Sequence, residues 1–166
     1  MKNPYNYLAI FILIFISRIV PHSPNFTPII AISFYIPAIL GIKFIIFYVL
    51  SYILIDIFFG FHDASFFVWG SIFLISLISQ HLTKSFLTRS IGVLTGSVIF
   101  FILTNFGVWT SGYYGYSLNG LISCYIAAIP FFNNTLISTV IYALIIESVM
   151  KLFFSNLITV KDKKKS

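Results

Sequence analysis

The chain has 166 residues, of which 59% are hydrophobic and 8% are charged, and its formal net charge is +6. Soluble domains carry roughly 25% charged residues, so a chain with this few charges cannot cover the surface of a soluble fold. The mean hydropathy of +1.01 agrees with this. The sequence predicts an integral membrane protein, with one transmembrane domain over residues 1–157 and a basic cytoplasmic tail over residues 158–166.

The positive charge does not predict a nucleic-acid partner, because the basic residues lie at the ends of apolar runs and in the tail. That placement is typical of membrane topology signals. The single cysteine, Cys124, cannot form an internal disulfide or a Cys-rich metal site. The N-terminal apolar run lacks a small-x-small cleavage site, so it is interpreted as a retained first helix.

The predicted helices follow from the apolar runs, some of which are shorter than the roughly 20 residues of a typical membrane span. In chain order they are Tyr5–Val20, Ile29–Leu40, Phe44–Phe59, Phe66–Ser79, Ser90–Thr104, Leu118–Phe132 and Thr135–Leu157. Between the first two, Arg18–Pro28 holds three prolines, and it cannot continue a helix. Pro37 is expected to kink the second helix. The spacing of Gly92 and Gly96 predicts close approach of a neighbouring helix.

The positions of the lysines and arginines indicate how many times the chain crosses the membrane. With the N-terminus in the cytoplasm and six crossings, nine of the ten basic residues lie on the cytoplasmic side, and Arg18 is the exception. A seventh crossing at Leu118–Phe132 would move the tail or most earlier loops outside. This segment is therefore predicted to be a re-entrant or interfacial helix in the last outer loop. The predicted fold is an all-α, polytopic bundle of six transmembrane helices in a bacterial inner membrane, with both termini cytoplasmic.

This topology places the segments with unusual chemistry on one side: Arg18–Pro28, Asp56–Ser65 and Asn105–Asn134. We therefore expect a small-molecule site that is open to the outside. The alternative for Arg18–Pro28 is an ordinary exposed turn. The candidate substrate-binding residues are Arg18, His22, Asn25, Asp56, His62, Asp63, Asn105, Trp109, Tyr116, Asn119 and Asn133.

Three charged residues within the apolar runs, Arg18, Asp56 and Glu147, have alternative interpretations. Arg18 and Asp56 lie at comparable depth, so they are hypothesised to form a pair that positions the Pro-rich loop or contacts an ionic substrate. The alternative is that Arg18 extends to lipid phosphate. For Glu147, pairing with Lys151 one turn later is the simpler interpretation, ahead of a proton relay or a contact between helices.

A metal site is less favoured than hydrogen bonding within loops. His22, His62 and Asp63, with Asp56, form the only group that resembles one, and their spacing matches no metal motif. Cys124 is interpreted as an apolar filler rather than a ligand for a metal or a corrinoid. No metal or other cofactor is therefore predicted.

The aromatic residues near the last loop are favoured as membrane-interface anchors. Stacking of Trp109, Tyr113, Tyr114 and Tyr116 on an aromatic or cationic ligand is the alternative. Enzyme signatures such as Gly-x-Ser-x-Gly, His-Glu-x-x-His and the P-loop are absent from the sequence. No enzyme is predicted, and an ATP-driven function would need a partner ATPase.

Four segments carry a resemblance to a known family: Pro21–Pro28, Asp56–His62, Thr104–Trp109 and Ala128–Thr135. Together they resemble a family of small, uncharacterised bacterial membrane proteins described only as candidate transport proteins, over roughly residues 15–145. The resemblance implies membrane lipid and an unknown small-molecule substrate as partners.

The size, the six predicted crossings and the outer site are also similar to the S components of energy-coupling factor transporters. This similarity implies uptake of a vitamin-, metal- or cofactor-like molecule, with a separate coupling subunit and ATPase as partners. One difference is that Ala9 is followed at i+4 by Leu13, whereas S components often carry a second alanine for docking. The alternative function is a non-transporting envelope scaffold or assembly protein, and an intramembrane enzyme is least favoured.

Overall fold

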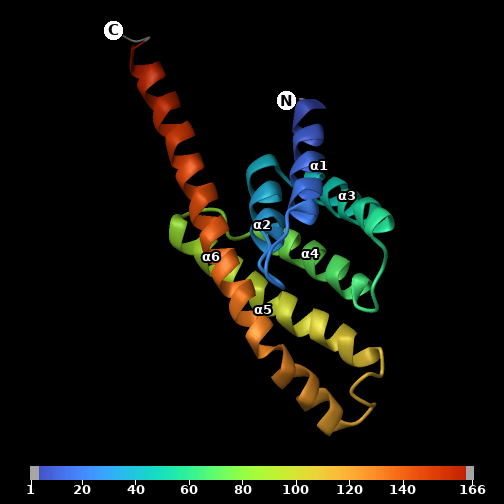
Figure 1. The fold of residues 1–166 in the computed structure, drawn as a ribbon. Coiled ribbons are helices and arrows are strands. Elements are labelled where there is room, and N and C mark those ends of the chain that lie inside the picture. The colour runs from blue at the N-terminus through green and yellow to red at the C-terminus, as the bar shows by residue number, and fades with distance from the viewer. Residues whose placement is uncertain (1–3, 164–166) are drawn as a thin grey trace.

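The computed structural model describes the backbone of residues 4–163 and the side chains of residues 5–152. In that part all regular secondary structure is helical, which confirms the all-α prediction (Figure 1). The helices are α1 (Pro4–Ile19), α2 (Ile29–Leu40), α3 (Lys43–Phe59), α4 (Ser65–Ser79), α5 (Phe86–Thr110) and α6 (Leu118–Lys163). The first four agree with the predicted runs to within a residue or two, and the proline-rich segment between α1 and α2 is not helical.

Helix α5 is longer than predicted at both ends. It begins at Phe86 because Ser85 and Thr88 cap it reciprocally: the Ser85 hydroxyl accepts from the Thr88 N–H (3.1 Å), and the Thr88 hydroxyl accepts from the Ser85 N–H (2.9 Å). At the other end it continues to Thr110, so residues 105–110 are helical rather than part of a loop.

Helix α6 is continuous, so the prediction of a separate re-entrant or interfacial helix is wrong. Pro130 lies inside α6 without ending it. The amide of Asn134 donates to the backbone oxygen of Pro24 (3.0 Å) rather than competing with its own helix. The re-entrant segment was inferred because a separate crossing at Leu118–Phe132 would have made seven. Since this segment and Thr135–Leu157 belong to one helix, they count as one crossing at most. The predicted tail over 158–166 overlaps the end of α6, and its last three residues lie outside the described part.

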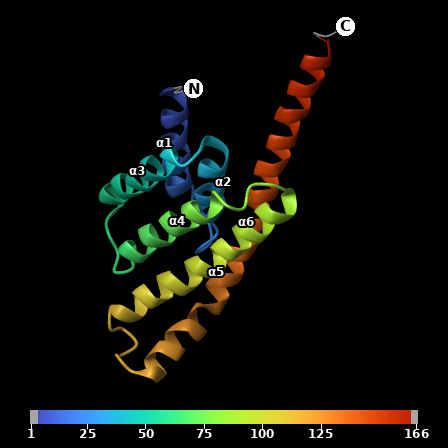
Figure 2. The ribbon, with the colours of Figure 1, turned by 180° about the vertical axis from the view of Figure 1, so that it is seen from behind.

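The prediction of six spans is met only in part. Among the described residues, α5 and α6 are the two helices that are long and apolar enough to cross a membrane. Helices α1 to α4 have 12 to 17 residues, or about 18–26 Å at 1.5 Å per residue. The hydrocarbon core of a bilayer is about 30 Å thick. Figures 1 and 2 show α6 alongside α5 and extending beyond the other helices toward the C-terminus.

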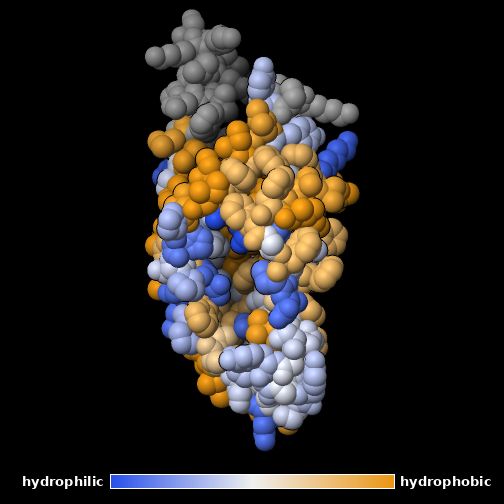
Figure 3. Space-filling model, turned by 45° about the vertical axis from the view of Figure 1, so that its right-hand side comes forward, coloured by the Kyte–Doolittle hydropathy of each residue, from blue (hydrophilic) through white to orange (hydrophobic). Residues whose placement is uncertain are grey.

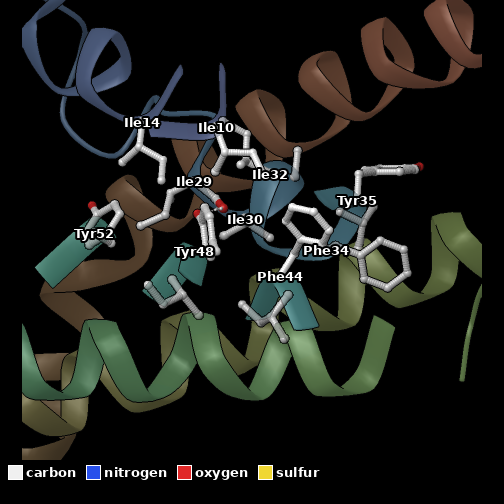
Figure 4. Packing of buried hydrophobic residues seen from close by; sticks show 14 of the residues in the cluster. Ile10, Ile14, Ile29, Ile30, Ile32, Phe34, Tyr35, Phe44, Tyr48 and Tyr52 are labelled. Atoms are coloured by element: carbon white, nitrogen blue, oxygen red, sulfur yellow. Dashed lines mark hydrogen bonds between the residues drawn. The ribbon is translucent and has the colours of Figure 1, made fainter. Parts of the chain in front are cut away.

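Helix α2 lies at the centre of the core. Seven consecutive residues, Ile29 to Tyr35, are buried in it. Figure 4 shows five of them, Ile29, Ile30, Ile32, Phe34 and Tyr35, between residues of the neighbouring helices that include Ile14 of α1 and Tyr48 of α3. The buried position explains why a 12-residue helix can be almost wholly apolar without a polar face.

Pro37 shapes the packing around α2. A proline has no N–H, so the carbonyl of Ser33, four residues earlier, loses its helical donor. The hydroxyl of Ser76 on α4 supplies a replacement (2.8 Å). The carbonyl of Pro37 in turn accepts from the side chain of Gln80 (2.9 Å). The proline thus ties α2 to α4 through side-chain hydrogen bonds.

The glycines of α5 let this helix approach α2 and α4, as predicted for Gly92 and Gly96. A Cβ at Gly92 would meet the buried ring of Phe34, and one at Gly96 would lie 3.2 Å from Ile75 and 3.3 Å from Ile30. These contacts explain why small residues are needed at this spacing.

The outer surface is strongly apolar, while several hydroxyls are buried. Phe58 is 80% exposed, Phe66 77% and Leu118 71%, whereas Ser33 and Ser97 are fully buried. Large exposed apolar side chains occur on all six helices. Contiguous exposed apolar surface marks sites of contact with protein or membrane.

Candidate functional site

A cavity of about 400 Å³, called the central cavity below, lies where segments distant in the sequence meet. Its volume falls within the roughly 300–1,000 Å³ of small-molecule sites. Figure 3 shows a hollow on one face of the molecule, with hydrophilic residues around it and hydrophobic surface above. The lining residues are Arg18, Pro24, Asn25, Thr27, Ile29, Tyr52, His62, Ala64, Val68, Phe100, Thr104, Asn105, Val108, Tyr114, Cys124, Ala127, Ala128 and Phe131.

One wall of the cavity is helical and shows the i+4 spacing of a helix face. Phe100, Thr104 and Val108 form one stripe on α5. The facing stripe on α6 includes Cys124 and Ala128. The two helices are joined here, since the Cys124 thiol contacts the carbonyl oxygen of Asn105 at 3.4 Å.

Arg18 and Asp56 form the predicted ion pair, with Nη2 of Arg18 at 2.6 Å from Oδ1 of Asp56. Asp56 is 1% exposed, and its second oxygen accepts from the indole N–H of Trp69 at 2.8 Å. The pair joins the last turn of α1 to α3, and Trp69 adds α4. Both oxygens of this buried carboxylate therefore have donors, as a charge in this setting requires.

The Arg18 guanidinium reaches the cavity from this cluster. Its side chain is 29% exposed, and its Cζ lies 5.5 Å from the ring centre of Tyr52 and 6.0 Å from that of Phe59. The Nε atom is buried and has no hydrogen-bond partner among the described residues. Arg18 therefore lines the cavity with the exposed part of its guanidinium, while its Nε is enclosed by protein.

The loop of residues 20–28 forms the irregular wall and is fastened to α6. Asn25 adopts a φ of 60°, a left-handed conformation that asparagine tolerates better than most residues. Its carbonyl accepts from the Ser138 hydroxyl at 3.5 Å, and the Pro24 carbonyl accepts from the Asn134 amide at 3.0 Å. Ser138 and Asn134 are four residues apart, so one face of α6 supports the loop.

The model of the family DUF6580, described as a family of unknown function, matches residues 2–160. The chain belongs to this family. No curated protein and no solved structure matches the chain. The description of DUF6580 mentions neither transport nor S components. The comparison therefore supports the resemblance to an uncharacterised family, and it does not test the similarity to S components.

In this DUF6580 member, four of the sequence-predicted site residues lie on the wall of the central cavity: Arg18, Asn25, His62 and Asn105. Asp56 lies behind Arg18 and holds it. The structure does not place the other six on the wall; these are His22, Asp63, Trp109, Tyr116, Asn119 and Asn133. His22 is exposed, and its ring contacts the carbonyl of the next residue at 2.9 Å.

The polar groups of Trp109 and Tyr116 serve their own loop. The indole N–H of Trp109 donates to the Gly115 carbonyl at 3.0 Å, and the Tyr116 hydroxyl donates to the Thr110 carbonyl at 3.2 Å. The two rings contact each other edge to face, with centroids 6.1 Å apart. These bonds stabilise the turn between α5 and α6 and leave Tyr114 of the same loop at the cavity.

Residues that the sequence argument did not select include Thr27 and Thr104 on the wall, and Ser138 behind the loop. Selection by residue type favoured segments predicted to be loops, whereas one wall consists of helical stripes. The i+4 spacing on α5 and α6 was the signal that could have found Thr104. In the described part of the chain, no three His, Cys, Asp or Glu side chains lie close enough to hold a metal ion.

The interpretation of Glu147 as the partner of Lys151 is wrong. Its oxygens accept from Arg89 in a two-pronged contact, Nε to Oε1 at 2.5 Å and Nη2 to Oε2 at 2.7 Å. The Tyr35 hydroxyl donates to Oε1 at 2.8 Å, and Nη1 of Arg89 donates to the Thr83 carbonyl at 3.0 Å. The cluster joins α2, α5 and α6, so Arg89, interpreted only as a topology signal, is a structural residue.

Proposed function

We propose that this protein is a multi-pass bacterial inner-membrane protein that captures a small molecule in the central cavity from the outer face, in the manner of a transporter's S component. The observation that carries the proposal is that the loop of residues 20–28, the turn near His62 and the facing stripes of α5 and α6 surround one cavity of small-molecule size. Residues so distant in the sequence are not needed together for a simple membrane anchor.

The mixture of groups on the wall supports binding rather than chemistry. Amide, hydroxyl and guanidinium groups lie among apolar side chains such as Phe100 and Phe131. This is the composition of a site that orients a ligand by a few polar contacts and surrounds it with apolar surface. A carboxylate, Asp56, is nearby, but Arg18 and Trp69 occupy both its oxygens.

The sidedness of the proposal rests on the charges. The loop 80–85 carries Lys84 and precedes Arg89, and it joins the ends of α4 and α5 that are remote from the cavity. Positive charges mark cytoplasmic ends, so the cavity would face outward. The exposed apolar surface and the two long apolar helices support a membrane setting. The termini would both be cytoplasmic.

The proposal is tested by mass spectrometry of small molecules released from protein purified in a mild detergent. Recovery of a defined compound, lost when Ala128 on the cavity wall is replaced by Trp, is expected. The matched control is Ile129→Trp. Ile129 is the next residue of α6, it is 51% exposed, and it does not line the cavity. Reporter fusions at both termini check the sidedness, and a C-terminal reporter active outside the cytoplasm would contradict it.

One observation favours the alternative of an envelope scaffold. Helix α6 has 46 residues, and its C-terminal part extends beyond the other helices (Figures 1 and 2). A partner protein could pack along such an extension. Under this alternative, truncation after Leu152 abolishes co-purification of an envelope partner, and no small molecule is recovered from the full chain.

A further inference from the structure

We propose that the ligand of the central cavity is an organic monocarboxylate whose carboxylate contacts Arg18 while its apolar body lies against α5 and α6. This inference rests on the proposed function, since it names the chemical class that the same cavity would take.

The cluster of Arg18, Asp56 and Trp69 offers donors to the cavity rather than acceptors. Asp56 has one oxygen bound to Arg18 and the other to Trp69, and it is 1% exposed. Arg18 has five N–H donors, and Asp56 accepts from its Nη2. The Arg18 side chain lines the cavity and is 29% exposed, so the exposed part of the guanidinium can donate to a ligand that carries an acceptor. A cationic ligand would find no available carboxylate at this position.

The charge of the wall suits one negative charge. The described residues that line the cavity include Arg18 but no lysine and no second arginine. The start of α2, at Ile29, and the N-cap of α4, Ala64, also line the cavity, and a helix N-terminus favours a negative charge. A single guanidinium beside a carboxylate matches a singly charged, planar group, and its fork geometry fits a carboxylate.

The rest of the wall suits an apolar body. Phe100 and Phe131 contribute aromatic rings, and Val68, Val108 and Ala128 contribute aliphatic surface. These residues belong to α4, α5 and α6, whereas Arg18 comes from the end of α1. A ligand with a carboxylate at one end and a ring or short chain at the other spans this arrangement.

The test uses two probes of matched size, benzoate and benzamide, measured by equilibrium dialysis against the full chain in nanodiscs. Benzoate presents the carboxylate, while benzamide has nearly the same shape without the charge. We expect wild-type protein to bind benzoate about tenfold tighter or more, since a charge-assisted hydrogen bond separates the two probes.

Arg18→Gln alone leaves Asp56 buried without its counter-charge, and this variant risks unfolding. The double variant R18Q/D56N removes both charges together and keeps hydrogen-bonding groups in place. It should bind both probes with equal affinity. The control K151Q makes the same charge change as R18Q at an exposed residue of α6 that does not line the central cavity, and it should keep the preference for benzoate.

Three outcomes would overturn the inference. Equal binding of the two probes by wild-type protein would show a small-molecule site that does not select for a carboxylate, which leaves the proposed function standing. A preference for benzoate retained by folded R18Q/D56N would place the selectivity away from Arg18. Binding of neither probe, with no small molecule recovered from the purified protein, would refute the proposed function as well.

Discussion

The cluster of Arg89, Glu147 and Tyr35 gives a sharp prediction about stability. Changing Glu147 to Gln keeps the shape of the side chain and removes its charge. Arg89 then has no counter-charge, although it is only 17% exposed, and Glu147 itself is 12% exposed. Removing one partner of a fully buried pair costs about 3–5 kcal/mol. Partial exposure lowers this figure, and we expect about 2–3 kcal/mol.

The assay is thermal unfolding of detergent-purified protein followed by circular dichroism. For a chain of this size, 1 kcal/mol corresponds to roughly 2–4 °C in Tm, so Glu147→Gln should lower Tm by about 4–12 °C. Arg89→Gln should have a similar effect. The double variant should lose less than the sum of the two, because the second change removes the uncompensated charge that the first one creates.

Lys151→Gln is the matched control, since Lys151 lies one turn after Glu147 and is exposed. It should change stability by less than about 0.5 kcal/mol, as for most surface substitutions. If Lys151→Gln lowered Tm as much as Arg89→Gln does, Glu147 would be paired along its own helix. Strict additivity of Glu147→Gln and Arg89→Gln would likewise refute the pairing between α5 and α6.

Three further substitutions test the packing around α2 by the same unfolding assay. Ser76→Ala should cost about 1–3 kcal/mol, because the carbonyl of Ser33 loses the donor that replaces the missing proline N–H; no loss would mean that this carbonyl is satisfied otherwise. Gly92→Ala should cost about 1–3 kcal/mol, because its Cβ would meet the fully buried ring of Phe34. Gly70→Ala is the control, because a Cβ added at Gly70 would have nothing within 4 Å. This change should be neutral or should stabilise the protein by up to about 1 kcal/mol. Equal losses of stability at Gly92 and Gly70 would contradict the close approach of α5 to α2.

The sequence was sufficient to predict the helices because apolar runs separated by polar or proline-rich segments are a local signal. The ion pair of Arg18 and Asp56 was also predictable, since both charges interrupt apolar runs at similar depth. The continuity of α6 was not, because Pro130 and the two asparagines after it look like a break in isolation. Whether they end a helix depends on tertiary contacts, here the bond from Asn134 to the loop.

Arg89 shows a second limit of sequence reasoning. Its position near the end of an apolar run indicates a topology signal, and that interpretation says nothing about its partner. The pairing with Glu147 joins residues 58 positions apart, a separation that no local pattern reveals. The cavity wall was missed in part for a related reason: residues were selected for their chemistry, while Thr104 and Ala128 reach the cavity through their position on helix faces.

The arrangement of the central cavity also indicates which wall can respond to a ligand. Helices α4 and α5 are in close contact near the cavity, where a Cβ at Gly107 would meet the ring of Phe67. The loop of residues 20–28 is joined to α6 by hydrogen bonds from Asn134 and Ser138, the longer of which measures 3.5 Å, and by the contact of Phe26 with Tyr142. Arg18 lies two residues before this loop. A ligand that drew the guanidinium toward the cavity would therefore act on the wall that is not helical, while the close packing of α4 on α5 kept the helical wall in place.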